Sequence, residues 1–158
     1  MTTDHDSGLA ERAVEEILFH FPYLIDRRLK PSYVEDRQVV FDDGTRVDLK
    51  FEGPSDIFII EIKKGPVDLK TYYQLTHYMN EVYLKVGERK KIVGIAIGYG
   101  VSDYAAIQDK MSKYPYEIQL KKLGEDIPTR LKFCTKCRRA NGASVNQCWN
   151  CGCGDFFH

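Results

Sequence analysis

Two acidic residues and a lysine have types and spacing that suit metal-dependent chemistry: Asp48, Glu61 and Lys63. Turn residues at positions 53–55 separate two β-rich runs, and a hairpin closed symmetrically between Pro54 and Ser55 places Asp48 directly opposite Glu61. Directly opposed carboxylates repel each other, but their Cβ atoms are roughly 4.5–5.5 Å apart, close enough to share one divalent cation. Strand alternation puts Lys63 on the face of Glu61. The pattern predicts a cation site; polar side chains on the wet face of a sheet are the alternative.

Two helical segments carry further polar side chains that can reach this group. Residues 10–21 have apolar side chains at helical spacing, with Glu11 at the edge of the apolar stripe and Glu16 on the opposite side. In a later segment, Gln74 and Tyr78 are four residues apart and are therefore neighbours on one helical face. We expect Glu11, Gln74 and Tyr78 to lie near the carboxylates. For each of them, a solvated or packing side chain is the alternative.

Five cysteines lie close together near the carboxyl end, and none occurs before residue 134. Two C-x-x-C pairs are separated by ten residues and comprise Cys134, Cys137, Cys148 and Cys151. Four thiolates at this spacing are typical of a structural zinc site, and a segment this short needs a metal to fold. Redox-active or unpaired thiols are the alternative. Cys153 is left over; it could compete with Cys151 as a ligand, but its spacing fits the second pair less well.

Basic and aromatic residues surround the two cysteine pairs. Lys136, Arg138 and Arg139 flank the first pair, and Trp149 lies within the second. Such a surface binds a phosphate backbone or stacks on unpaired bases, so we expect these four residues to contact a nucleic acid. A Trp149 that only covers the metal site is the alternative.

The elements that must position these residues are expected in the order αβββαβαβ. The patterns predict strands at residues 33–41, 45–51, 56–63, 91–98 and 116–120, and helices at residues 10–21, 66–86 and 102–111. An Asp-Gly pair at residues 43–44 predicts a hairpin between the first two strands. Residues 121–130 are polar, with one Gly and one Pro, and are expected to form a linker.

Length, composition and charge bound the class of protein. The chain has 158 residues, of which 43% are hydrophobic, enough for one main domain and a small satellite module. The net charge is zero, but residues 1–62 hold 7 basic and 14 acidic residues, residues 63–120 hold 9 and 6, and residues 121–158 hold 7 and 3. This uneven distribution of charge could place carboxylates that bind a hard cation beside basic surfaces that bind phosphates. Solvated charged faces are the alternative.

The ends of the sequence and its apolar runs bear on location. The amino terminus is acidic and lacks the apolar run of a secretory signal, and no apolar stretch is long enough for a membrane span. Cysteines confined to one metal-binding pattern fit a reducing compartment. We expect a cytoplasmic protein.

The order and spacing of these motifs resemble those of a known group of enzymes. The residues that carry the likeness are Asp48, then Glu61, Ile62 and Lys63, then Gln74 and Tyr78. On an αβββαβ plan, they resemble the PD-(D/E)XK nuclease superfamily with the Q-x-x-x-Y motif of its RecB-like branch. Within it, residues 9–120 are similar to the catalytic domain of the NucS/EndoMS endonucleases. The family's separate amino-terminal domain, which supports dimerisation and DNA binding, has no counterpart in this sequence.

The resemblance implies a fold and a metal site. The fold is a restriction-endonuclease-like α/β core with a mixed central sheet flanked by helices, followed here by a small zinc ribbon. Asp48, Glu61 and the backbone carbonyl of Ile62 would ligate Mg²⁺ or Mn²⁺, because oxygen ligands suit these hard ions. Glu11 would be an additional ligand, directly or through water.

The resemblance also implies roles for the other residues of the motif. Lys63 would position the nucleophile and offset charge that grows on the phosphoryl oxygens. Gln74 and Tyr78 would hold the site or the adjacent phosphate. Lys64, next to the catalytic lysine, would contact DNA.

We therefore expect a metal-dependent DNA endonuclease that hydrolyses phosphodiester bonds, with the zinc ribbon assisting DNA binding. The nuclease domain is expected at residues 1–122, and the linker and zinc ribbon at residues 123–158. DNA is the expected partner, and double-strand cutting would require a homodimer or two visits. The alternatives are a catalytically silent adaptor with a nuclease fold that binds DNA or protein, and a nuclease that acts on RNA.

Overall fold

The computed structural model describes residues 13–41 and 44–158. The described chain begins with a helix at residues 13–20. The elements that follow are η1 (Pro22–Leu24), β1 (Val34–Val40), β2 (Arg46–Glu52), β3 (Asp56–Ile62), α2 (Leu69–Val86), η2 (Gly87–Arg89), β4 (Lys91–Gly98), α3 (Tyr104–Lys113), β5 (Glu117–Lys122), β6 (Leu131–Cys134), β7 (Ala140–Gly142) and β8 (Phe156–Phe157). We refer to the described part of residues 13–127 as the main body, and to residues 131–158 as the cysteine module.

The main body is built on a mixed five-stranded sheet with the strand order β1-β2-β3-β4-β5. The first two pairs are antiparallel, and the pairs β3–β4 and β4–β5 are parallel. The parallel pairs require crossover connections, which α2 and α3 supply. The expected α/β core with a mixed sheet flanked by helices is confirmed.

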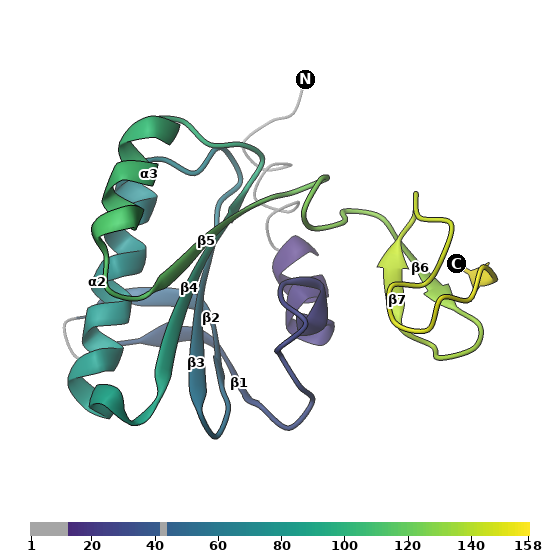
Figure 1. The fold of residues 1–158 in the computed structure, drawn as a ribbon, viewed down its shortest axis with the longest axis horizontal. Coiled ribbons are helices and arrows are strands. Elements are labelled where there is room, and N and C mark those ends of the chain that lie inside the picture. Colours follow the sequence, from purple (N-terminus) through teal and green to yellow (C-terminus); the bar gives the residue numbers. More distant parts are fainter. Residues whose placement is uncertain (1–12, 42–43) are drawn as a thin grey trace.

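Helices cover both faces of this sheet, as Figure 1 shows. Helices α2 and α3 lie on one face, where Leu75 and Met79 of α2 pack with Ile57 and Ile59 of β3. The helix at residues 13–20 and η1 lie on the other face, over a second apolar cluster that includes Phe58. The alternation of β3 between two buried faces explains why its sequence is an almost continuous apolar run.

Several element boundaries differ from the sequence-based expectation, and two of these differences have a clear physical cause. Helix α2 begins at Leu69, not at residue 66, because Asp68 caps it: its carboxylate accepts a 2.8 Å hydrogen bond from the Thr71 backbone N–H. The segment expected to be a linker begins inside the main body. Strand β5 continues to Lys122. Ile127 is fully buried in the apolar cluster beneath the helix at residues 13–20, which we call the N-terminal helix.

The cysteine module forms a separate three-stranded sheet with the order β7-β6-β8. All its strands pair antiparallel, and each is short. In Figure 1 the module lies beyond the N-terminal helix, on the opposite side of that helix from the main sheet. Such a small sheet cannot bury a large core.

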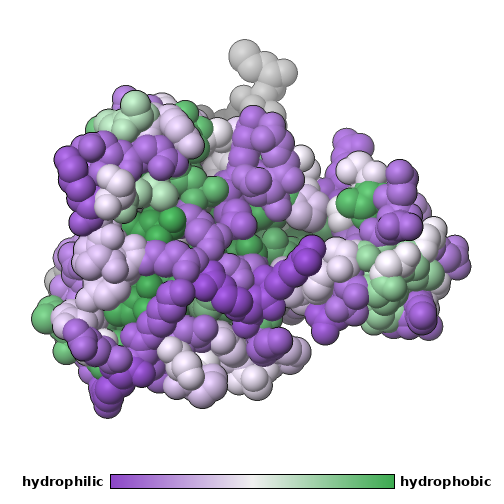
Figure 2. All heavy atoms as spheres, viewed as in Figure 1, coloured by the Kyte–Doolittle hydropathy of each residue, from purple (hydrophilic) through white to green (hydrophobic). Residues whose placement is uncertain are grey.

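The surface in the view of Figure 2 is mostly hydrophilic, with apolar side chains showing between charged ones over the helical layer. No helix within the described ranges is both long enough and apolar enough to cross a membrane.

Candidate active site

The β2–β3 hairpin brings Asp48 and Glu61 together. The observed pairs run from Glu52 opposite Ile57 to Leu49 opposite Ile60, which is the register expected from the turn. One residue further, the same register places Asp48 opposite Glu61. Glu61 is buried, with only 4% of it exposed, and Asp48 is half-buried.

Side-chain hydrogen bonds replace the backbone ladder at this point. The backbone N–H of Asp48 donates to Glu61 Oε1 at 3.3 Å, and the backbone N–H of Ile62 donates to Asp48 Oδ2 at 2.8 Å. Each carboxylate is therefore anchored by the backbone of the opposite strand. These bonds hold the two acids together although their charges repel.

Lys63 lies beside the carboxylates and links them to helix α2. Its Nζ lies 3.4 Å from Glu61 Oε2 and donates a 3.0 Å hydrogen bond to Gln74 Oε1. The capped first turn of α2 fixes the position of Gln74 relative to β3. Asp48, Glu61, Lys63 and Gln74 therefore form one connected group drawn from three elements.

The electrostatics of the pair favour binding of a proton or a cation. Burial, followed by the charge of Asp48, raises the pKa of Glu61 to about 7. Burial also raises the pKa of Asp48, and the charge of Glu15 adds to that effect. A carboxylate with a raised pKa is stabilised by positive charge. Oxygen donors in such a setting fit a hard divalent cation.

Glu15 and Gln38 belong to this site, and sequence reasoning missed both. Gln38 Nε2 donates to Asp48 Oδ1 at 3.2 Å and to the two carboxylate oxygens of Glu15 at 3.3 and 3.4 Å. Glu15 follows Glu11 by four residues, so helical spacing alone places it on the face assigned to Glu11. A hairpin closed symmetrically around the turn sequence at residues 42–44 would likewise have placed Gln38 opposite Asp48.

The remaining residues of the predicted site lie in different surroundings. Glu11 is outside the described residues. Tyr78 is buried, and its ring stacks on Phe41 with centroids 5.6 Å apart. Lys64 is exposed and lines a hollow of about 320 Å³ that also borders Lys63 and Gln74.

Known structures share the architecture of the main body. No family model and no curated protein matches the sequence. A repair endonuclease from Pyrococcus abyssi aligns with a TM-score of 0.56 and 18% identity, over 71% of this chain and 46% of that one. EndoMS in complex with double-stranded DNA aligns with a TM-score of 0.55 and 18% identity, over 71% of this chain and 44% of the solved chain.

The chain has the fold of the EndoMS-type repair endonucleases. It matches less than half the length of each solved chain. The expected NucS/EndoMS-like fold is thereby confirmed, and it places the Asp48–Glu61 pair on a scaffold that repair endonucleases also use.

The EndoMS-like body is followed by a cluster of four thiols in the cysteine module. Their sulfur atoms all lie within 4.8 Å of one another, and within the described ranges they are the only group of three or more candidate ligand side chains that converge in this way: Cys134, Cys137, Cys148 and Cys151. The arrangement suits a tetrahedral metal ion. Cys153 lies outside the group, and its sulfur accepts a 3.5 Å hydrogen bond from the Asp155 backbone N–H.

Hydrogen bonds prepare one of these sulfurs to bind a metal. Burial alone raises the pKa of the Cys148 thiol, but N–H donors from the backbone of Cys151 and Asn150 and from the Asn141 side chain lower it to about 6. A thiolate, not a thiol, is the form that ligates a metal. The surrounding donors therefore favour the ligating state.

Trp149 contacts the EndoMS-like body instead of lying free on the module. Its ring lies against Tyr23 with centroids 5.1 Å apart, and Arg27 and Arg139 lie over it. Its indole N–H donates to the Ala140 carbonyl at 2.9 Å. These contacts favour a structural role for Trp149 at the junction with the main body, which differs from both expectations for this residue, DNA contact and cover of the metal site.

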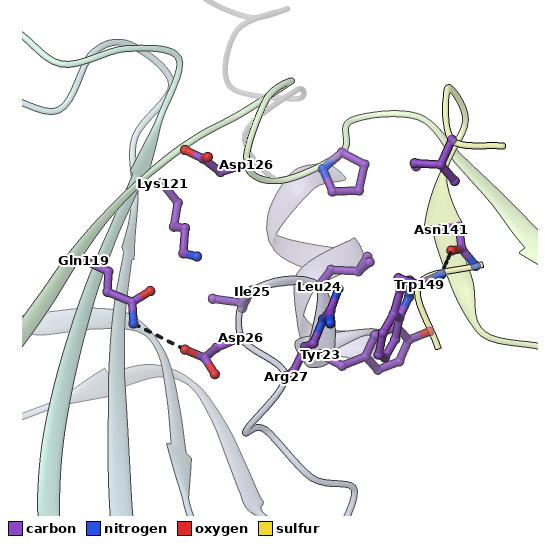
Figure 3. A pocket seen from close by; sticks show the side chains of 13 residues that line it. Tyr23, Leu24, Ile25, Asp26, Arg27, Gln119, Lys121, Asp126, Asn141 and Trp149 are labelled. Carbon is purple, nitrogen blue, oxygen red and sulfur yellow. Dashed lines mark hydrogen bonds between the residues drawn. The ribbon is translucent and has the colours of Figure 1, made fainter. Parts of the chain in front are cut away.

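A cleft of about 500 Å³ opens beside this contact, between the body and the module. Figure 3 shows Tyr23 and Trp149 together on one side of it and Gln119 and Lys121 on the other. The residues that line the cleft include none of the carboxylate site. On the module itself, Lys136 and Arg138 are exposed, whereas Arg139 is partly covered by its contact with Tyr23.

Proposed function

We propose that this protein is a divalent-cation-dependent DNA endonuclease. The observation that carries the proposal is the pair of the half-buried Asp48 and the buried Glu61, held by the backbone and joined to Lys63 and Gln74, on the fold of repair endonucleases. An inert scaffold gains nothing from two acids, one buried and one half-buried, that repel each other. A cation-binding site accounts for the arrangement.

Asp48, Glu61 and the backbone carbonyl of Ile62 would hold Mg²⁺ or Mn²⁺. Glu15, tied to Asp48 through Gln38, is a further carboxylate available to that ion. Glu11, which the sequence resemblance implies as an additional ligand, lies outside the described residues. When bound, the ion supplies Lewis acidity to the scissile phosphate and lowers the pKa of a coordinated water.

Lys63 has the position to act on the substrate directly. Its ammonium group lies at the edge of the acid pair, and Gln74 holds it there by a 3.0 Å hydrogen bond. From this position it would orient the attacking water and offset the negative charge that grows on the phosphoryl oxygens. Gln74 would act through Lys63, and the buried Tyr78 would support α2 from the core side.

The cysteine module would bind one structural zinc ion and assist DNA binding. Lys136 and Arg138 are its exposed cations, and a phosphate backbone is the anion that such a surface would contact. One site of this kind cuts one strand at a time, so a double-strand break in a single encounter would require two copies.

A cleavage assay tests the proposal. Duplex, single-stranded, branched and mismatched DNA, together with RNA, would be incubated with Mg²⁺ or Mn²⁺. We expect cutting of at least one DNA substrate, and loss of at least 10²-fold in Asp48→Ala, Glu61→Ala and Lys63→Ala. Asp109→Ala, which removes an exposed acid of α3, is the matched control and should cut normally.

The other outcomes separate the rival functions. Cutting of RNA alone would make the protein a ribonuclease. Tight DNA binding without cutting by the wild-type protein would favour an adaptor. Equal cutting by the wild-type protein and all three variants would refute the assignment of the site.

A further inference from the structure

Gln38 faces Asp48 across the β1–β2 pair, yet the backbone ladder is interrupted at this position alone. The pairs Arg37–Leu49 and Val39–Val47 flank it in one continuous register, while Gln38 and Asp48 do not form a ladder pair. The reason is the backbone of Gln38, which has a φ of 50°. This left-handed conformation is unfavourable for a residue with a Cβ, and it is unusual inside a strand.

The interruption turns the Gln38 amide toward two carboxylates. Its Nε2 donates to Asp48 Oδ1 at 3.2 Å and to Glu15 Oε1 at 3.3 Å. Asp48 Oδ2 already accepts a hydrogen bond from the Ile62 backbone N–H. Both oxygens of Asp48 are therefore held, one by β3 and one by β1.

This double restraint distinguishes Asp48 from an ordinary surface acid. A carboxylate fixed through both oxygens presents its remaining lone pairs in one orientation, without first having to lose rotational freedom. Hydrogen bonds to ligating carboxylates orient them and support metal affinity. Strained backbone conformations also concentrate at functional sites, where surrounding contacts maintain them.

We propose that Gln38 is a positioning residue that orients Asp48, and with it Glu15, for a divalent cation. The inference rests on the proposed function, because it assigns Gln38 a role toward the ion that Asp48 and Glu61 would hold. Gln38 acts through Asp48 and does not touch the substrate. Its strained backbone is what directs the amide between the two acids.

The test is a direct measurement of Mn²⁺ binding in the absence of DNA, by isothermal titration calorimetry or electron paramagnetic resonance. Gln38→Gly and Gln38→Ala both remove the amide, but only glycine tolerates the left-handed backbone. We expect both variants to bind Mn²⁺ about tenfold more weakly than the wild-type protein. Val40→Ala, at an exposed position of the same strand, should bind normally.

Two further readouts separate positioning from folding. With a chelator present, Gln38→Gly should melt at a higher temperature than Gln38→Ala, because glycine relieves the strain. With Mn²⁺ at saturation, both variants should regain a cleavage rate near that of the wild-type protein. Unchanged Mn²⁺ affinity in both variants, or weaker affinity in Gln38→Ala alone, would overturn the proposal.

The variant Asp48→Asn separates failure of the inference about Gln38 from failure of the proposed cation site. If the wild-type protein binds Mn²⁺ and Asp48→Asn does not, the cation site exists, and the Gln38 variants then test the inference alone. If the wild-type protein and Asp48→Asn bind Mn²⁺ equally, the cation site itself is wrong and the role of Gln38 is wrong with it.

Discussion

Asp48 and Glu61 exchange backbone for side-chain hydrogen bonds across β2 and β3: the Asp48 N–H donates to Glu61, and the N–H that follows Glu61 donates to Asp48. The exchange holds both acids at the end of the ladder, where ordinary strand pairing would have left their side chains free to separate. Their repulsion must then be relieved by a proton or by a cation. The stability of the protein should therefore depend on both.

The first prediction concerns pH in the absence of divalent cations. Burial, followed by the Asp48 charge, raises the pKa of Glu61 from 4.5 to about 7. Between these values the folded protein binds more protons than the unfolded chain, so stability falls as pH rises through this window. Glu61→Gln removes this loss, and we expect it to stabilise the chelated protein near pH 8 by up to about 3 kcal/mol, with little effect near pH 5.

Thermal unfolding at the two pH values, with and without Mn²⁺, checks this prediction. Mn²⁺ should stabilise the wild-type protein most at the higher pH and should leave Glu61→Gln almost unaffected. Asp109→Asn, which changes an exposed acid, controls for general charge effects. Equal destabilisation of Glu61→Gln at both pH values would show that ionisation of the buried Glu61 does not lower the stability of the folded protein.

The second prediction concerns metal in the cysteine module. We expect metal analysis to find one zinc ion per chain, and Cys148→Ser to lose it together with the structure of β6 and β7, because a module this small depends on the metal to fold. Cys153→Ser is the matched control, since its sulfur lies outside the four-thiol group. Zinc loss in Cys153→Ser, or a folded module without zinc in Cys148→Ser, would contradict the assignment.

Local sequence patterns predicted the features that depend on neighbouring residues, such as turn positions and strand register. The turn before β3 fixes the register of the hairpin, so the meeting of Asp48 and Glu61 followed from the sequence. Glu15 lies four residues, or about one helical turn, after Glu11 in the sequence. Helical spacing from Glu11 would therefore have identified Glu15 as a further acid of the site. The left-handed backbone of Gln38 could not be foreseen, because no glycine or asparagine at that position indicates it.

The sequence patterns could not predict contacts between segments that are far apart in the chain. Tyr23 and Trp149 are far apart in the chain, and neither has a spacing that predicts the other. The segment after β5 has a polar composition typical of a linker, yet Leu123 and Ile127 anchor it in the core. Two apolar residues among polar ones carry too weak a periodic signal to reveal that burial.

The third prediction concerns the contact between the main body and the cysteine module. The Tyr23 hydroxyl accepts a 2.8 Å hydrogen bond from the N–H of the fully buried Ala140. Tyr23→Phe should cost about 1 kcal/mol by leaving that donor unpaired, and Tyr23→Ala should cost a further ~1 kcal/mol through loss of ring contact. Trp149 is the only tryptophan, so its fluorescence should shift to longer wavelength, more for Ala than for Phe.

A tyrosine far from this contact supplies the control for the fluorescence experiment. Tyr104 is 58% exposed on α3, and Tyr104→Ala should leave the Trp149 emission unchanged. Unaltered emission in Tyr23→Ala would mean that the ring of Trp149 is protected by the module itself. The contact with Tyr23 would then contribute nothing to holding the two parts together.

The fourth prediction concerns the path of DNA away from the acid pair. Lys64 and Lys70 are exposed and line the hollow of about 320 Å³ that Lys63 and Gln74 also border. A phosphate next to the scissile one would enter this hollow and displace counterions from both lysines. With cleavage blocked by omitting Mg²⁺ and Mn²⁺, Lys64→Ala and Lys70→Ala should each lower the slope of log affinity against log salt by about 1. Lys113→Ala, with a side chain 73% exposed on α3, should leave the slope unchanged. Equal slopes in all of these proteins would place the DNA backbone elsewhere and leave the hollow without a part in binding.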